Sequence, residues 1–466
     1  MTVPALSAPF SYTAEGLLAF DGRSLEALGR QYGTPLFIGS RARLEANVDR
    51  FVRAFAGYAP GALLSYSTKT NSNVGLLQVL SQTSVYAGVC SGLDYRAARR
   101  AGFPPTRLIF DGLVKTPDDL ATAVRERVAL INAESWEELA LINDLSRQQG
   151  CVTPVGLRAR LGPAGGHALS VKHLLGIGYD RFGFDVRSGL LEQVLERARQ
   201  LPHLRVEGLH IHEGSHYRSA APYLHNFHGL WPVIQSWWRR APGTLKYLNL
   251  GGGFGVPSVQ PYQAWDLIRN TGRHLLGRPT TYDLAAHPID WDRIGSTIAT
   301  EVTTTFQRAG WPPPQLVFEP GRAIVGDAFV LLCRVLLRKE VPRSGTWLVL
   351  DAGTNLFPYL LSFNEYHQIV PVRRAAADQP EVVHLAGPLL YSSDIVMKHC
   401  ALPRLAPGAM VAILDAGAYT LAYSNQFLYP RPTVVLLDRG QAVQVIREAE
   451  TPDDVLRHDR VPSLEP

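Results

Sequence analysis

Lys69 is the residue of this chain whose surroundings most clearly suggest chemistry. It closes the run Ser65-Tyr66-Ser67-Thr68-Lys69, which follows a short apolar stretch typical of a β-strand. A lysine that a strand end delivers into a pocket can form a Schiff base with a carbonyl group. We therefore consider an enzyme of amine chemistry, in which other segments must supply the partners of Lys69.

Three later segments carry polar or glycine-rich motifs where apolar runs end. They read His212-Glu213-Gly214-Ser215, Gly251-Gly252-Gly253 and Glu319-Pro320-Gly321-Arg322. Backbone N–H groups of the glycines and the guanidinium of Arg322 are suited to bind phosphate. A phosphate site opposite a lysine predicts pyridoxal 5'-phosphate, held by Lys69 through a Schiff base. Glu319 would then keep the pyridine nitrogen protonated, and His212 would stack on the ring.

The elements that must position these residues follow a regular order. Strand-like runs alternate with helical stretches, and the strands are expected at 62–67, 84–90, 107–111, 128–132, 155–160, 204–212, 246–250 and 315–319. This is the α/β pattern of a (β/α)8 TIM barrel, whose active site lies at the carboxyl ends of its strands. Lys69, His212, the glycine triplet and Glu319 all fall at such ends.

A second domain is expected after the barrel. Beyond about residue 325 the strand-like runs continue without regular helices, which indicates a C-terminal β domain. We expect a cofactor-binding barrel at 36–325 and a β domain built from 1–35 and 326–466. The N-terminal segment is assigned to the β domain because it needs a surface to pack on.

Composition excludes several other classes of protein. The 466 residues are 46% hydrophobic and 19% charged, which suits a large core and two domains. The net charge of +5 is dispersed and its basic runs are short, so nucleic-acid binding is not expected. The four cysteines form no CxxC pair, which argues against disulfides or a zinc site. A secretion signal and a membrane span are both absent from the pattern, so we expect a cytoplasmic protein without a membrane partner.

Six motifs occur in an order that resembles a known family. They are Tyr66-x-x-Lys69-x-Asn71, Gly208-Leu209-His210-Ile211-His212-Glu213-Gly214-Ser215, Gly251-Gly252-Gly253-Phe254-Gly255, Glu319-Pro320-Gly321-Arg322, Gly387-Pro388-x-x-x-Ser392-x-Asp394 and Asp415-Ala416-Gly417-Ala418-Tyr419. Together they resemble the fold-type III pyridoxal-phosphate decarboxylases, the diaminopimelate, ornithine and arginine decarboxylase group, which is related in fold to alanine racemase.

The resemblance implies an amino-acid decarboxylase, a lyase of amino-acid metabolism that acts as a homodimer with active sites at the subunit interface. It assigns Lys69 and His212 to catalysis and cofactor binding and Glu319 to the pyridine nitrogen. The residues that it assigns to the cofactor phosphate are Ser215, Gly252, Gly253, Gly321, Arg322 and Tyr419. On the substrate side it places Tyr391, Asp394 and Phe427.

Two residues depart from the family where the substrate binds. The family has a cysteine after its Gly-Pro, supplied by the partner subunit, which protonates the substrate carbanion, and next to it an acidic residue that helps bind the substrate's distal amine. Leu390 and Tyr391 occupy these positions. Leucine cannot donate a proton, so Tyr391 is a candidate catalytic acid, beside Lys69 and His212. Without the acidic residue, diaminopimelate, lysine and ornithine become less expected as substrates.

Smaller departures lie elsewhere in the chain. Gly88 stands where the second strand of the family usually ends in aspartate, and Arg181 stands where lysine is usual. The segment 256–305 is longer than expected, and it could shape a substrate pocket or a dimer contact.

Three alternatives remain open at this point. A racemase or epimerase could use Lys69 and Tyr391 as its two bases, although Glu319 disfavours this reaction. A catalytically silent homologue could bind pyridoxal phosphate and act through a partner. His210 and His212 could instead form a metal pair, but no further ligands follow at later strand ends, so we expect no metal.

Overall fold

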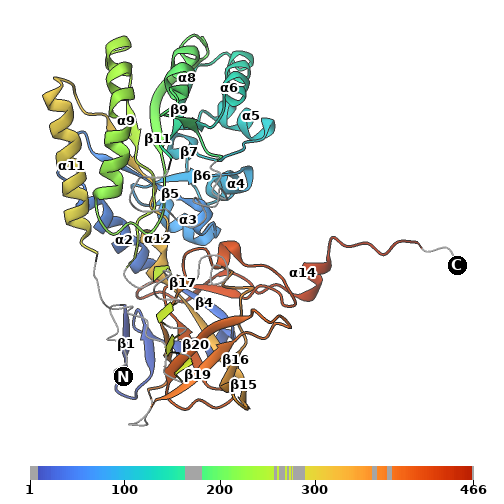
Figure 1. Ribbon diagram of the computed structural model, residues 1–466. Helices are drawn as coiled ribbons and strands as arrows, with labels where there is room; N and C mark the ends of the chain where they lie inside the picture. Colours follow the sequence, from blue (N-terminus) through green and yellow to red (C-terminus); the bar gives the residue numbers. More distant parts are fainter. Residues whose placement is uncertain are drawn as a thin grey trace. The chain divides into compact units, whose positions relative to one another are not determined.

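The computed structural model describes residues 9–162, 181–256, 289–358, 365–374 and 380–463, together with 260–261, 268–269, 272–273 and 275–276. The chain divides into two compact units, which Figure 1 draws and which are described one at a time below. One unit comprises residues 45–255 and 289–324, and the other comprises 1–44, 256–288 and 325–466.

The first unit is a closed barrel of eight parallel strands. They are β5 (Ala62–Ser67), β6 (Tyr86–Val89), β7 (Leu108–Phe110), β8 (Leu130–Ala133), β9 (Thr153–Arg160), β11 (Leu204–Ile211), β12 (Tyr247–Asn249) and β14 (Gln315–Phe318). Strand β14 pairs with β5, and β8 pairs with β9, which completes the ring. A short strand, β10 (Phe184–Asp185), adds to β9. The predicted (β/α)8 barrel is confirmed, and every predicted barrel strand is present.

Helices cover the outside of this barrel (Figure 1). They are α2 (Arg41–Ala54), α3 (Val74–Ser81), α4 (Gly92–Arg100), α5 (Pro117–Glu126), α6 (Trp136–Gln148), α8 (Leu190–Ala198), α9 (Ala221–Arg240) and α11 (Trp291–Arg308). The 3-10 turn η1 (Thr68–Thr70) and the short helix α12 (Arg322–Val325) follow β5 and β14 at the carboxyl ends of the strands, and the 3-10 turn η2 (Pro105–Arg107) precedes β7. Ser91, Thr116 and Ser135 begin α4, α5 and α6, because each side-chain oxygen accepts a hydrogen bond from the N–H three residues later. The strand ends thus pass into capped helices.

The inside of the barrel changes from apolar to polar along the strands. Four inward side chains form an apolar cluster, namely Leu63, Ile109, Leu130 and Val317. Because side chains two residues apart on a strand share a face, the next inward residues on three of these strands are Asp111, Asn132 and Glu319. The alternation therefore fills one end of the barrel with hydrocarbon and gathers polar groups at the carboxyl end.

The second unit is built mainly of antiparallel β structure, as predicted for the additional β domain. Its elements are β1 (Phe10–Tyr12), β2 (Leu18–Phe20), β3 (Arg23–Ser24), α1 (Leu25–Tyr32), β4 (Leu36–Ser40), β13 (Gln260–Pro261), η3 (Gly326–Ala328), β15 (Phe329–Val341), β16 (Gly345–Leu350), β17 (Glu365–Tyr366), β18 (Ile369–Pro371), β19 (Glu381–Ala386), β20 (Ile395–Leu402), β21 (Met410–Ile413), η4 (Leu421–Tyr423), β22 (Thr433–Leu437), β23 (Gln444–Arg447) and α14 (Pro452–Leu456). Strand β15 pairs with β16, β21 and β4.

The division between the units differs from the boundary expected at residue 36. Strand β4 pairs antiparallel with β15 and parallel with β22, so its hydrogen bonds belong to the β unit. Phe10, Leu18 and Phe20 pack in one apolar cluster with Val330 and Leu332 of β15. Within the long segment 256–305, most residues up to 288 lie outside the described part of the chain. The last residues of the segment belong to α11.

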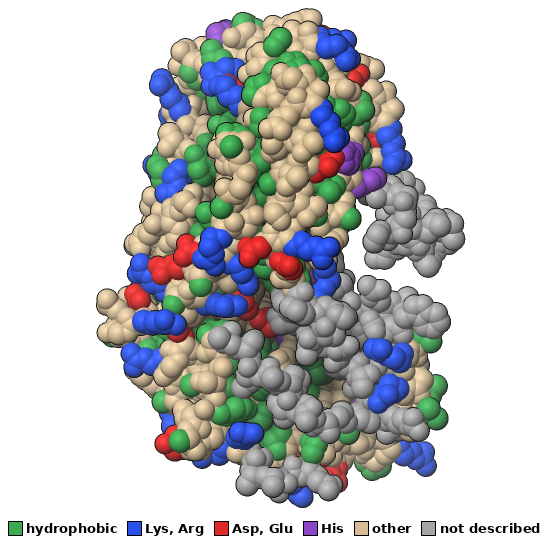
Figure 2. Space-filling model, turned by 90° about the vertical axis from the view of Figure 1, so that its left-hand side faces the viewer, with side chains coloured by type: hydrophobic (Ala, Val, Ile, Leu, Met, Phe, Trp, Pro, Cys, Tyr) green, Lys and Arg blue, Asp and Glu red, His purple; other side chains and the backbone are tan. Residues whose placement is uncertain are grey.

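The surface carries its charge in a dispersed form. On the face drawn in Figure 2, Lys and Arg side chains lie singly or in small groups among acidic, apolar and uncharged atoms. Among the described residues, no helix combines the length and the apolar character needed to cross a membrane.

Gly295 generates a prediction about packing. A side chain on this buried residue of α11 would collide with the backbone carbonyl of Ala54, at the end of α2. We expect Gly295→Ala to lower the free energy of unfolding by about 1–3 kcal/mol, measured by urea denaturation, because a packed backbone must move. Gly57→Ala is the matched control, since a Cβ there would have nothing within 4 Å. Equal stability of the two variants would contradict this account of the helix contact.

Candidate active site

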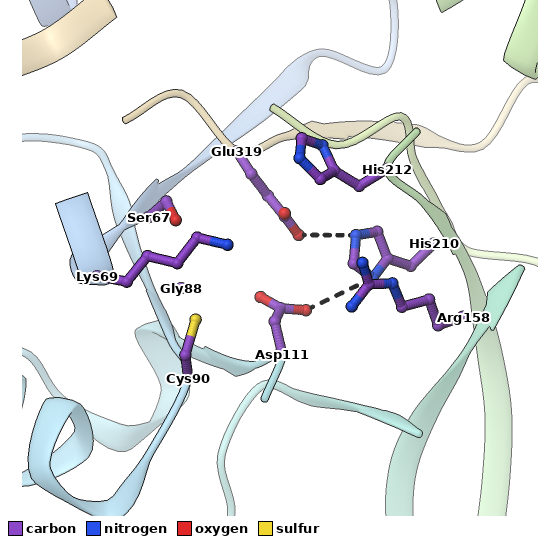
Figure 3. A pocket seen from close by; sticks show the side chains of 9 residues that line it. All are labelled: Ser67, Lys69, Gly88, Cys90, Asp111, Arg158, His210, His212 and Glu319. Carbon is purple, nitrogen blue, oxygen red and sulfur yellow. Dashed lines mark ion pairs between the residues drawn. The ribbon is translucent and has the colours of Figure 1, made fainter. Parts of the chain in front are cut away.

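A pocket opens at the carboxyl ends of the barrel strands. It is lined by Ser67, Lys69, Gly88, Cys90, Asp111, Arg158, His210, His212 and Glu319. Figure 3 shows that the side chains of these residues converge from strand ends all around the barrel. Three residues of the predicted site, Lys69, His212 and Glu319, therefore lie in one cavity.

Lys69 lies on the 3-10 turn that follows β5. The hydroxyl of Thr68 donates a hydrogen bond to the carbonyl of Gly88 at 2.9 Å, which ties this turn to β6. The hydroxyl of buried Tyr66 donates to the carbonyl of Asn71 at 3.0 Å and closes the turn from the other side. Because both ends of the turn are fixed, the Lys69 side chain extends into the pocket, as Figure 3 shows.

Glu319 follows β14 and keeps a negative charge in the depth of the pocket. Asn249 Nδ2 donates a hydrogen bond to its Oε1 at 2.6 Å, and His210 Nε2 lies 3.3 Å from the same oxygen. Burial acts to raise the pKa of Glu319, but the facing His210 and the hydrogen bonds outweigh it and hold the pKa well below the usual range. Glu319 is thus ionised and able to hold a proton on a facing ring nitrogen.

His212 is held as a neutral imidazole. Its Nδ1 accepts a hydrogen bond from the Gly252 N–H at 3.1 Å, which leaves the ring proton on Nε2. Burial, and then the positive charges of Lys69 and Arg158, lower the pKa of His212 to about 3, although Glu319 opposes the shift. A neutral ring with a fixed tautomer can lie flat against a planar ligand without adding charge.

The predicted phosphate residues lie on loops that approach each other closely. Side chains on Gly252, Gly253 and Gly321 would collide with the Glu319 carbonyl, the Gly214 carbonyl and the Thr70 hydroxyl respectively. Only glycine permits this close approach of the loop backbones, and the N–H of Gly252 is used by His212 Nδ1. Ser215 is exposed beside Gly253, and Arg322 is buried at the start of α12.

These residues fit pyridoxal phosphate on two observations. The pocket carries an amine, a neutral imidazole and an ionised carboxylate, which match the carbonyl, the ring face and the pyridine nitrogen of the cofactor. The glycine loops at its edge provide the cradle that a phosphate needs, and the buried hydroxyl of Thr70 beside Gly321 has no hydrogen-bond partner among the described residues.

Several pocket residues were missed by the prediction from sequence. Asp111, Arg158 and Cys90 each lie near a strand end with their side chains directed inward. Like Lys69, they lie at the carboxyl ends of predicted strands, where the active site of a barrel is expected. They belong to no recognisable motif, so the sequence did not single them out. Arg158 pairs with buried Glu134 and lies over the ring of Phe182, 4.4 Å from its centroid.

The geometry also changes the metal alternative based on His210 and His212. His210 groups with Asp111 and Glu319, whose ligand atoms lie within 4.8 Å of one another, whereas His212 uses Nδ1 to accept from Gly252. Asn249 donates a hydrogen bond to the Glu319 carboxylate, and His210 Nε2 lies 3.3 Å from the same oxygen.

Four predicted site residues belong to the β unit. Tyr391 and Phe427 are about half exposed, Leu390 is 95% exposed, and Tyr419 has a left-handed backbone with φ 57°. Because the units are described separately, the cofactor role of Tyr419 and the substrate roles of Tyr391 and Phe427 stay predictions.

Asp394 has a clear structural function in its own unit. Its Oδ1 accepts hydrogen bonds from the N–H of Thr354 at 2.7 Å and from its hydroxyl at 3.0 Å, and its Oδ2 accepts from the Leu389 N–H at 2.8 Å. The buried carboxylate thereby fixes the loop that carries Leu390 and Tyr391. Its predicted contact with substrate stays a prediction.

Comparisons with known proteins agree with this geometry. Residues 41–326 match the family described as "Pyridoxal-dependent decarboxylase, pyridoxal binding domain". The diaminopimelate decarboxylase of Methanocaldococcus jannaschii is 28% identical over 453 residues, which cover 96% of both chains. That of Pseudomonas aeruginosa is 30% identical and covers 98% of this chain and 97% of its own. The crystal structure of the M. jannaschii enzyme in co-complex with L-lysine superposes with a TM-score of 0.84 at 26% identity and covers 98% of each chain.

The neutral His212 generates a prediction about pH. Since its folded pKa lies near 3 and a free histidine titrates near 6.5, the unfolded chain binds the extra proton first as pH falls. Stability from this group is complete above about pH 6.5 and decreases toward pH 3, with a slope of at most about 1.4 kcal/mol per pH unit. We expect cofactor-free His212→Gln to lose less stability than wild type between pH 6.5 and 4.5, measured by urea denaturation.

The control for this experiment is His225→Gln, which removes an exposed histidine on α9. It should follow the wild-type pH dependence. A His212→Gln variant with the wild-type slope would show that the ring is not held neutral.

Proposed function

Because the chain belongs to the pyridoxal-dependent decarboxylase family, we propose that it removes the α-carboxylate of an amino acid other than a standard diamino acid. Its cofactor is pyridoxal 5'-phosphate, and its reaction class is that of a carboxy-lyase. The observation that carries the choice of substrate is the pair Leu390 and Tyr391, which stands where the family has a cysteine and an acidic residue.

The residues of the barrel serve the cofactor end of the reaction. When bound, pyridoxal phosphate accepts the electrons of the bond that breaks at the substrate α-carbon. Lys69 supplies the amine that binds the carbonyl carbon and that the substrate amine displaces. Glu319, which is ionised, holds the proton on the pyridine nitrogen, and neutral His212 supports one face of the ring.

Tyr391 serves the substrate end in this proposal. After carbon dioxide leaves, its hydroxyl donates a proton to the α-carbon, which Leu390 cannot do. The proposal is supported by the exposure of both side chains on a loop that Asp394 holds in place. An exposed leucine and tyrosine on a fixed loop suit an insertion into a second subunit, so we propose a homodimer in which Tyr391 of the partner subunit completes each site.

The proposed substrate class follows from the presence of Tyr391 where the family has an acidic residue. A carboxylate near the distal end of the substrate would attract a second amine, and Tyr391 provides no such charge. A neutral, acidic or larger side chain is therefore favoured. The exposed Phe427 and Leu428 on the loop before β22 add apolar surface to the residues assigned to this side.

A diamino acid is the second candidate, because the relatives carry that name and the M. jannaschii enzyme was solved with L-lysine. Diaminopimelate, lysine and ornithine should accordingly be assayed beside neutral, acidic and larger amino acids. Faster turnover of the diamino acids would contradict the proposed substrate class and leave the decarboxylation reaction unaffected.

Replacing Lys69 tests the reaction itself. We expect Lys69→Ala to release no measurable carbon dioxide from the best substrate and to lose the visible absorption of lysine-bound cofactor, since no other pocket group can replace the amine. Lys339→Ala removes an exposed lysine of β15 and should behave as wild type. Incorporation of solvent deuterium at the α-carbon with the carboxylate retained would instead indicate racemisation.

Tyr391→Phe tests the proton donor. The variant keeps the ring and loses only the hydroxyl, so we expect kcat to fall by about 10²-fold, the usual contribution of a general acid. The absorption spectrum of the bound cofactor should not change. Tyr423→Phe, at another exposed tyrosine of the same unit, is the control. Unchanged kcat would remove Tyr391 from the candidates for the acid.

A further inference from the structure

The pocket contains a carboxylate in an unexpected place. Gly88, the next-to-last residue of strand β6, stands where the resembling family usually has aspartate, so this strand supplies no acid there. The neighbouring strand β7 is followed by Asp111, whose N–H donates to the Val89 carbonyl of β6 at 2.8 Å. Figure 3 shows the Asp111 side chain directed into the same space as Lys69.

The two positions compete for the same volume. A Cβ on Gly88 would lie 3.3 Å from Asp111 Oδ2 and 2.8 Å from the Ser65 hydroxyl. An aspartate at residue 88 would therefore place a second carboxylate directly against that of Asp111. Two such charges repel strongly when they share a site away from water, so the pocket accommodates only one of them in ionised form.

Neighbouring strands are adapted to hold Asp111. Asn132 of β8 donates through Nδ2 to Asp111 Oδ1, and Gly156 of β9 leaves room for Asn132, since a Cβ there would collide with Asn132 Oδ1. Lys115, which is buried, donates to the carbonyls of Gly112 and Asn132 at 2.7 and 2.8 Å and fixes the loop after Asp111. Two strands and one loop thus support this carboxylate.

Burying the Asp111 carboxylate at this depth costs desolvation free energy, which suggests that the acid has a function. The Asp111 side chain is only 8% exposed, and burial, together with the charge of Glu319, raises its pKa to about 6. His210 Nδ1 lies 3.8 Å from Asp111 Oδ1, and its Nε2 faces Glu319. A buried acid with a built support is a candidate for a functional group.

We propose that Asp111 supplies, from β7, the pocket carboxylate that the family usually places on β6, so that the pair Gly88 and Asp111 is a transposition of one functional acid. Asp111 is a positioning residue: it gives the nitrogen of Lys69 a facing negative charge and orients His210 toward Glu319. This inference rests on the cofactor of the family and not on the substrate proposed above.

A transposition cycle tests this assignment. The cofactor-free protein is titrated with pyridoxal phosphate, and the dissociation constant is measured by absorbance without any substrate. We expect Asp111→Asn to weaken binding by about tenfold or more, the loss typical of a hydrogen-bonded charge. Gly88→Asp should also weaken binding, because it crowds two carboxylates. The double variant Gly88→Asp/Asp111→Asn should bind more tightly than either single variant, since one carboxylate is restored.

Two controls separate charge from shape and fold. Gly88→Ala adds a Cβ without charge and measures the steric part, and Asp118→Asn makes the same acid-to-amide change at an exposed residue of α5. The Tm of each cofactor-free variant is recorded in parallel. If Asp111 had only a structural role, Asp111→Asn would lower the Tm, and adding Gly88→Asp would not restore cofactor binding.

The inference is overturned if Asp111→Asn binds cofactor like wild type, or if the double variant binds no better than the weaker single variant. Failure of the substrate proposal would leave this cycle unchanged, because no amino acid is present in the titration.

Discussion

The closed barrel imposes one constraint on which the whole site depends. Along each parallel strand every second side chain points inward, and the strands all end at the same mouth. The inward series that begins with Leu63, Ile109 and Val317 must therefore continue toward that mouth. Asp111 and Glu319 lie in the pocket because they follow this register, two residues beyond an apolar partner. The apolar layer also keeps water away from the floor on which these charges stand.

Charge in such a floor must be compensated within the network. Glu319 is ionised because His210 and Asn249 face it, whereas Asp111 is destabilised as an anion by burial and by Glu319 itself. His212 is neutral for the corresponding reason, since a cation would be poorly solvated beside Lys69 and Arg158. The same cavity thus holds two carboxyl groups whose pKa values are shifted in opposite directions, as is common where acid–base chemistry takes place.

The strand ends that bear motifs were predictable from the sequence, and those without motifs were not. Lys69, His212 and Glu319 could be found because each belongs to a short motif that closes an apolar stretch. The motifs are a polar run that ends in one lysine, a His-x-His pair and a Glu-Pro-Gly-Arg turn. Asp111 and Arg158 close similar stretches, but an isolated acid or arginine at a strand end is ordinary in sequence. The compact units divide after residue 44, because β4 pairs with β15 and β22, which lie far from it in the sequence.

The sequence by itself determined the order of strands and helices, the barrel with its added β structure, and the placement of Lys69, His212 and Glu319 at strand ends, because these depend on local periodicity and on short motifs. Tertiary structure decided which side chains meet. The closeness of Gly88 to Asp111 joins two strands, and the support of Asn132 by Gly156 joins two more. Such contacts depend on register between strands and on the volume left by an absent Cβ, neither of which is encoded in any single segment.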